Sequence, residues 1–167
     1  FALAFFFSCQ KPTETPENQP QPRALAPEEA SGLYPYRRLS TYGIFDGEMK
    51  KLEPSSQFHF YAPASSLFTD YAKKSRFIFL PEGQKAKLNE SELELPKGTI
   101  LVKNFYYPAD FRKPEGERRI IETRLMIHEE GGWQAYPYIW NEEQTDAILK
   151  IVGGSTKVYF TDQTGKD

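Results

Sequence analysis

The strongest hydrophobic pattern runs from 118 to 140, where two alternating apolar and polar stretches flank a Gly-Gly pair. Side chains of a strand alternate between two faces, so residues two apart share a side. The stretches 118–128 and 133–140 are therefore predicted to be the arms of a β-hairpin. Gly131 and Gly132 supply the positive φ that its tight tip requires.

A four-residue tip pairs His128 with Trp133, which fixes the register of the whole hairpin. On one face this register sets three pairs opposite each other: Leu125 with Tyr136, Thr123 with Tyr138, and Ile121 with Trp140. A slip of one residue would exchange the two faces, so the register is well specified. We expect Trp140 to be buried against Ile121, and Trp133 to lie on the opposite face, nearer solvent.

Several other segments are predicted to be strands. In each, apolar or β-branched residues alternate with polar ones or occur consecutively, and Gly or Pro turns bound the segment. These segments are 58–61, 76–80, 85–88, 93–95, 99–107 and 155–161, while 147–152 fits helix or strand and favours strand. Segment 99–107 is apolar on both faces and should be a central strand. The charged segments 85–88 and 93–95 are expected at sheet edges.

A short helical turn is predicted within 39–45, and no segment shows long helical periodicity. Strands separated by Gly and Pro turns are typical of an all-β fold. The sequence therefore predicts an antiparallel β-sandwich or partly closed barrel with few short helical turns.

The chain opens with an apolar segment, 1–8, that is followed directly by Cys9. This arrangement resembles the end of a bacterial lipoprotein signal, in which the Cys becomes the acylated first residue. The alternative is a free Cys behind a truncated hydrophobic start. Lipidation of Cys9 would make the membrane a partner and place the protein in the bacterial cell envelope, with the outer membrane as the expected site.

Residues 10–33 are rich in Pro, Gln, Glu and Asn and cannot bury much apolar area, so they predict an extended tether. We therefore expect a signal with its acceptor Cys in 1–9, a tether in 10–33, and one β-rich domain in 34–167 that continues in a longer parent protein. The chain's 167 residues and net charge of −2 give no reason to expect nucleic acid as a partner. A single Cys excludes an internal disulfide and a Cys-rich metal site.

No catalytic constellation emerges from the sequence, and no catalytic or metal-ligating residue is assigned. The two histidines, His59 and His128, show no metal-ligand spacing, so each is interpreted as structural. Glu122 and Arg124 lie two apart on one strand face and are expected to pair with each other or a neighbour. These observations favour a protein that is not an enzyme.

The aromatic residues give the one indication of binding. Flat rings beside amide and carboxylate groups can stack on sugars, but they also form the cores of sandwiches, and we favour the core for the second arm of the hairpin. Three residues remain as possible ligand or partner contacts: Trp133, Tyr107 and Asn141. Asn141 with Gln144 three residues on also resembles a helix capping box.

Several blocks of the sequence together carry a family resemblance. They are Leu67–Ala72, Arg76–Gly83, Gly98–Arg112, Ile121–Leu125, Gly132–Trp133 and Tyr138–Ala147. Taken jointly, from about residue 39 to the C-terminus, they resemble the N-terminal β-rich domain of an exported bacterial family of dihaem c-type cytochromes.

The resemblance implies an accessory domain, with the haem-bearing part lying downstream. Covalent haem attachment needs Cys-x-x-Cys-His, and the only Cys in this chain is Cys9. We therefore expect no haem or other cofactor in this chain, and haem c only in the missing downstream part. The expected function is a non-catalytic accessory domain of a membrane-anchored envelope electron-transfer lipoprotein, with a haem domain or redox protein as partner. The alternative is a carbohydrate-binding β-sandwich module.

Overall fold

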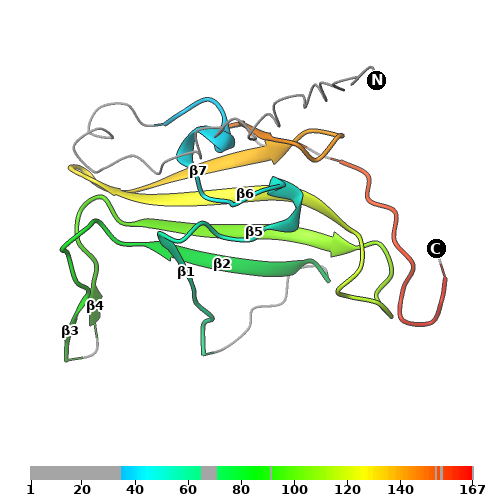
Figure 1. Cartoon of the computed structure of the whole chain (residues 1–167), viewed down its shortest axis with the longest axis horizontal. Coiled ribbons are helices and arrows are strands. Elements are labelled where there is room, and N and C mark those ends of the chain that lie inside the picture. The colour runs from blue at the N-terminus through cyan, green and yellow to red at the C-terminus, as the bar shows by residue number, and fades with distance from the viewer. Residues whose placement is uncertain (1–34, 65–70, 91, 153, 155, 167) are drawn as a thin grey trace, which may run out of the picture.

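The computed structural model describes residues 35–64, 71–90, 92–152, 154 and 156–166. Its main element is a six-stranded antiparallel sheet in the order β1-β2-β5-β6-β7-β8 (Figure 1). These strands are β1 (Phe58–Phe60), β2 (Lys73–Phe79), β5 (Ile100–Pro108), β6 (Arg118–Glu129), β7 (Gly132–Trp140) and β8 (Ala147–Leu149). The sheet is open, with β1 and β8 at its edges, and the predicted antiparallel all-β class is confirmed.

Two short 3₁₀ turns and a small hairpin complete the described fold. The turn η1 (Leu39–Tyr42) confirms the helical turn predicted near the start of the domain, and η2 (Met49–Lys51) follows it. The strands β3 (Lys87–Asn89) and β4 (Glu92–Glu94) pair only with each other and project away from the main sheet (Figure 1). They were expected to be edge strands, and each is one, because they form a separate two-stranded sheet.

The central hairpin has the predicted register. His128 pairs with Trp133, Leu125 with Tyr136, and Thr123 with Tyr138. The predicted central strand is also confirmed, because β5 lies between β2 and β6 and pairs with both along most of its length.

Ile121 does not take the core position that the alternating pattern gave it. Phe105 pairs with Glu122 and Tyr106 with Ile120, so Ile121 is the extra residue of a β-bulge in β6. One extra residue reverses the alternation of faces beyond it. Ile120 is consequently buried, with 1% of its surface exposed, and Ile121 is half-buried. The predicted packing of Ile121 against Trp140 is therefore wrong.

A chain of hydrogen-bonded side chains crosses four adjacent strands, and all of its members except the half-buried Ser75 are buried. The Asn104 amide donates to Ser75 Oγ at 3.0 Å, and Thr123 Oγ1 donates to Asn104 Oδ1 at 2.6 Å. The Trp140 indole N–H donates to Thr123 Oγ1 at 2.9 Å. Burying a polar group costs free energy unless the group is hydrogen-bonded, so these bonds offset the cost of burying Asn104 and Thr123 in the core.

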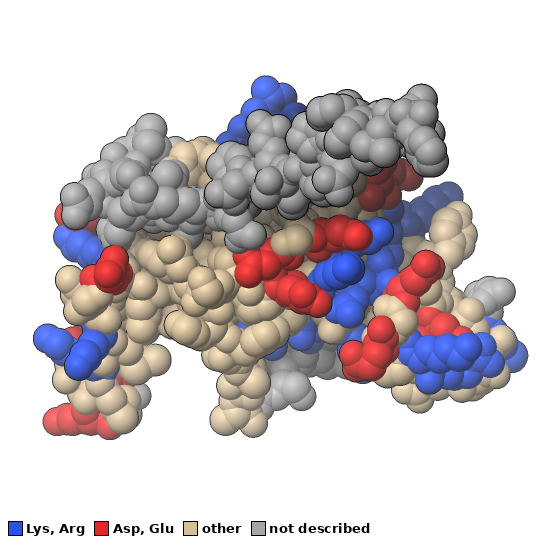
Figure 2. Space-filling model, in the orientation of Figure 1, with Lys and Arg blue, Asp and Glu red and all other residues tan. Residues whose placement is uncertain are grey.

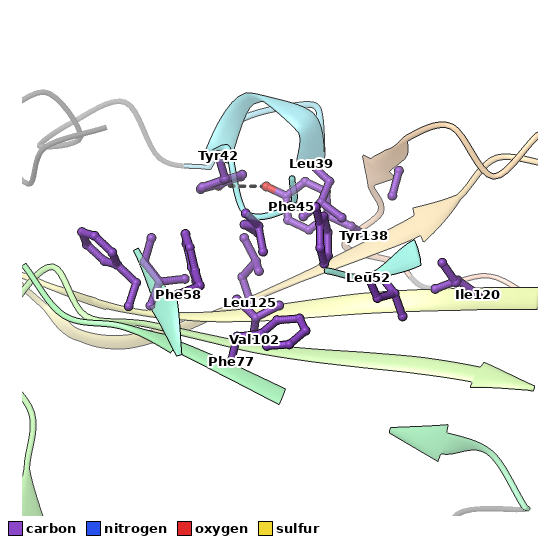
Figure 3. Close-up of a cluster of buried hydrophobic side chains, with 14 of the residues drawn as sticks. Leu39, Tyr42, Phe45, Leu52, Phe58, Phe77, Val102, Ile120, Leu125 and Tyr138 are labelled. Carbon is purple, nitrogen blue, oxygen red and sulfur yellow. Dashed lines mark hydrogen bonds between the residues drawn. The ribbon is translucent and has the colours of Figure 1, made fainter. Parts of the chain in front are cut away.

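The apolar core lies between one face of the sheet and the N-terminal segment that carries η1 and η2 (Figure 3). From this segment Leu39, Tyr42 and Phe45 pack onto residues of the sheet, as Figure 3 shows. Tyr42 Oη and Tyr138 Oη are joined by a 2.9 Å hydrogen bond. Burial, the hydrogen bond and the charge of Tyr138 raise the pKa of Tyr42 far above its usual range. The cover of the sheet is thus a looping segment and not a second large sheet.

The C-terminal segment departs from its prediction. Segment 155–161, expected as a strand, makes only an isolated bridge between Thr161 and Asp110 in the described residues. Two backbone hydrogen bonds hold this bridge, from Thr161 N–H to Ala109 O and from Phe111 N–H to Thr161 O, each at 2.9 Å. The ring of Phe160 also stacks on Tyr107, with ring centroids 5.5 Å apart. Segment 147–152 begins as the favoured strand, because β8 spans Ala147–Leu149.

No helix follows Asn141, so the predicted capping box is also wrong. Gln144 has φ 57° and turns its side chain across to β6. Its amide oxygen accepts from Ile120 N–H at 2.6 Å, and its Nε2 donates to Ile120 O at 3.2 Å. The amide therefore completes the backbone hydrogen bonding of Ile120 beside the bulge, where the pairing of β6 with β7 has ended.

The predicted signal in 1–9, including Cys9, and the tether in 10–33 lie outside the described residues. Within the described part, no helix is long and apolar enough to cross a membrane. The β-rich domain predicted from residue 34 onward contains every strand that the structure describes.

Trp140→Ala should destabilise the protein strongly, because Trp140 is only 6% exposed and its indole bonds to Thr123. Removing a large ring from a packed core costs about 3–5 kcal/mol, a large part of a domain's roughly 5–15 kcal/mol. Trp133→Ala is the matched control; at 38% exposure it should cost about 1 kcal/mol or less. Urea denaturation of both variants measures the difference, and equal costs would contradict this assignment of faces.

Candidate functional site

No described helix or strand covers the second face of the main sheet. We call it the open face. It comprises the side chains of the central strands that alternate with the buried ones. The described elements outside the main sheet are η1 and η2, on the core side, and the projecting β3–β4 hairpin.

An apolar row crosses the open face at right angles to the strands. Ile78 of β2 pairs with Leu101 of β5, Leu101 with Met126 of β6, and Met126 with Ala135 of β7. Met126 is 40% exposed, and Ile78 and Leu101 are half-buried. Residues directly opposite on neighbouring strands lie about 5 Å apart, so the row forms a continuous apolar band.

A cationic row runs beside the apolar row, two residues further along each strand. Arg76 of β2 pairs with Lys103 of β5, and Lys103 pairs with Arg124 of β6. Lys103 Nζ lies 4.7 Å from the centroid of the Phe105 ring, and the Arg124 guanidinium lies 5.5 Å from it. Three cations are therefore held side by side, two of them over one aromatic ring.

Only one of these three cations has a carboxylate partner among the described residues. Arg124 Nη2 lies 2.7 Å from Glu122 Oε1, which confirms the predicted pairing of these two residues. No ion pair involves Arg76 or Lys103 in the part of the chain that the structure describes. Partial burial lowers the pKa of Lys103, the nearby charges of Arg76, Lys74 and Arg124 lower it further, and the Glu122 carboxylate partly offsets this effect.

Trp133, the better exposed of the predicted contact residues, lies at one end of the open face. Its indole stacks on the His128 imidazole, with centroids 4.7 Å apart and planes at 10°. His128 Nδ1 lies 2.9 Å from Leu95 O. This arrangement gives His128 a structural role, as the sequence predicted, since its ring joins Trp133 to the loop before β5.

Tyr107 lies on the same face at the opposite end of the sheet, where the ring of Phe160 stacks on it and partly covers it. On β5, Tyr107 pairs with Arg119 at one end of the strand, while the β5 residue nearest to Trp133 is Ile100 at the other end. Roughly 20 Å of strand separates the two aromatic residues. The structure therefore does not bring Trp133 and Tyr107 together as the single platform that a carbohydrate site requires.

Asn141 belongs to the loop between β7 and β8, where its side chain bonds within the loop. Its Oδ1 accepts from Thr145 N–H at 2.9 Å and from Asp146 N–H at 3.3 Å, and its Nδ2 donates to Thr145 Oγ1 at 2.8 Å. The Asp146 carboxylate in turn accepts from Ser40 and Arg38. These bonds show that Asn141 shapes the loop that holds η1 against the sheet.

The described residues offer no cluster of side chains that fits a metal ion. No group of three or more His, Asp or Glu side chains in that region is placed to hold a metal ion. The haem c implied by the family resemblance does not fit this chain, because one Cys cannot make its two thioether links. The open face presents an apolar row beside a row of cations, and this combination suits contact with another molecule.

Elsewhere, the surface charges are mixed. Figure 2 shows basic and acidic residues lying next to each other on the side of the molecule drawn there. Such a group occurs at η2, where Lys50 and Lys51 lie 3.1 and 3.9 Å from carboxylate oxygens of Glu48. The cationic row of the open face, with one carboxylate beside three cations, differs from this balanced arrangement.

Sequence reasoning missed Arg76 and Lys103, which belong to strands far apart in the sequence. Within each strand the sequence shows only that these cations alternate with residues that are buried, such as Phe77 and Val102. Their convergence depends on the register between β2 and β5, which a single strand pattern does not contain.

Comparisons of the chain with protein-family models, curated proteins and solved structures gave no match.

Proposed function

We propose that this chain is a non-catalytic accessory domain of a membrane-anchored, cytochrome c-like envelope lipoprotein involved in electron transfer. In this proposal its work is to present a rigid surface to a haem domain or redox protein. The resemblance of the sequence blocks to the N-terminal domain of dihaem cytochromes supplies the electron-transfer context. Cys9 supplies the lipid anchor, and residues 10–33 supply the spacer from the membrane.

The observation that carries the proposal is the difference between the two faces of the sheet. The core face is closed by the N-terminal segment and fixed by the buried chain of hydrogen bonds from Ser75 to Trp140. The open face presents apolar and cationic rows with no described element over them. A sheet that is rigid on one side and open on the other supports a role in docking better than a role in catalysis.

Because this chain has no haem-attachment motif, the proposed role of the domain is to position other parts and not to carry electrons. Electrons would pass through cofactors held by another part of the protein or by its partner, while the accessory domain positions that part. The side chains of the open face act through contact area and charge, neither of which requires a redox change in this chain.

The purified chain should be colourless and redox-silent, because it has no Cys-x-x-Cys-His motif. An absorbance spectrum before and after denaturation, with a pyridine haemochrome assay, measures covalent haem directly. A Soret band that survives denaturation would contradict the assignment of haem to another segment. The same assay on the protein isolated from its native envelope should detect haem on the longer polypeptide, and its absence there would contradict the electron-transfer role.

Cys9→Ser should move the protein from the membrane fraction to the soluble fraction, because the substitution removes the thiol that begins lipidation. Several acyl chains on one residue give stable anchoring, so the change should be nearly complete. Fractionation followed by mass spectrometry of the N-terminal peptide measures both localisation and lipid mass. Ser8→Ala, which keeps a small residue before the Cys, is the control and should remain in the membrane fraction; pelleting of both variants would argue against lipidation.

A further inference from the structure

The cationic row is a feature that packing alone does not explain. Arg76, Lys103 and Arg124 are directly opposite one another on three adjacent strands. Like charges in that relation destabilise a sheet, and sheets ordinarily place opposite charges or neutral residues there. The row therefore lowers the stability of the isolated chain, and its presence calls for a compensating interaction outside the fold.

Among the described residues, the chain neutralises only part of the charge of this row. Glu122 pairs with Arg124 at 2.7 Å, while Arg76 and Lys103 have no ion pair there. The row thus keeps an excess of positive charge in a chain whose net charge is −2. The Phe105 ring holds Lys103 and Arg124 through its face but adds no negative charge.

The surroundings of the row fit a protein better than a small anion. Leu101 and Met126, which are partly exposed, lie directly beside the cations, and Trp133 marks the end of the same face. Met, aromatic residues and Arg are the types enriched where proteins bind one another, and Trp and Arg contribute most to such contacts. The two rows extend across three adjacent strands, which suits a broad partner surface better than a small ion.

We propose that the open face binds a partner protein through an acidic surface, whose carboxylates pair with Arg76 and Lys103 while apolar groups cover Leu101 and Met126. This inference rests on the proposed docking function and names the chemistry of the partner. A second copy of this chain matches this surface poorly, because its own open face carries the same excess of positive charge.

The test uses the full chain carrying Cys9→Ser, so that no lipid anchor contributes to binding. Fluorescein-labelled poly-L-glutamate is the probe, followed by fluorescence anisotropy at low and at physiological salt. Replacing Arg76 and Lys103 together by Gln should weaken binding about tenfold, because two fixed charges next to an apolar surface are lost. Lys50→Gln with Lys51→Gln removes the same charge from η2, where Glu48 already pairs with it, and should change binding by less than about twofold.

A stability measurement separates a binding row from a structural one. Lys103→Gln removes a repelled cation, so its melting temperature should equal or exceed that of the parent. A clearly lower melting temperature would show that the contact of Lys103 with Phe105 holds the sheet together, which would overturn the proposal.

Other outcomes would also overturn it. Equal weakening by the η2 variant would mean nonspecific attraction of a polyanion, and so would binding that Arg76 and Lys103 do not affect. Binding to phosphatidylglycerol vesicles but not to poly-L-glutamate would make a membrane surface the ligand. The haem and lipid assays test the proposed function separately. If the parent protein carries lipid and haem but its open face binds no acidic polypeptide, the proposed function is retained and only the acidic partner is rejected.

Discussion

The fold depends on one buried line of side-chain hydrogen bonds that runs across β2, β5, β6 and β7. Asn104 and Thr123 are fully buried, and each has its polar atoms paired with a neighbouring strand. A slip of any one strand by a residue would turn its member of the line to the other face and leave buried polar atoms unpaired, at a cost of about 1–3 kcal/mol for each group. The line therefore fixes the register of four strands together.

A fixed register determines what both faces carry. The alternation that buries Phe77, Val102 and Leu125 also places Arg76, Lys103 and Arg124 in one row on the other side. The bulge at Ile121 ends this regular alternation, and Gln144 completes the backbone bonds of Ile120 beyond it. The same strand pairings therefore determine both the core and the docking surface. A surface built in this way does not require a pocket or a mobile loop.

Sequence patterns predicted the parts of this fold that depend on local information. The hairpin register followed from the short tip at Gly131 and Gly132, and the burial of Trp140 followed from the register. The bulge was missed because a one-residue insertion against β5 leaves no mark in the pattern of β6 alone. The cationic row was missed for the same reason, since it depends on pairing between distant strands. Of the predicted contact residues, Trp133 and Tyr107 do lie on the open face, but at its two ends, while Asn141 serves a loop.

The main sheet has one face packed into the core and one face open to solvent among the described residues, and hydroxyl-radical footprinting of the full chain distinguishes the two faces. Met126 and Trp133, 40% and 38% exposed, should be oxidised rapidly, whereas Trp140 at 6% and Tyr138 at 0% should be protected. The fold predicts this contrast in the folded protein and its loss in urea. Protection of Met126 equal to that of Trp140 in the folded protein would mean that another part of the chain covers this face, and would rule out an open docking surface.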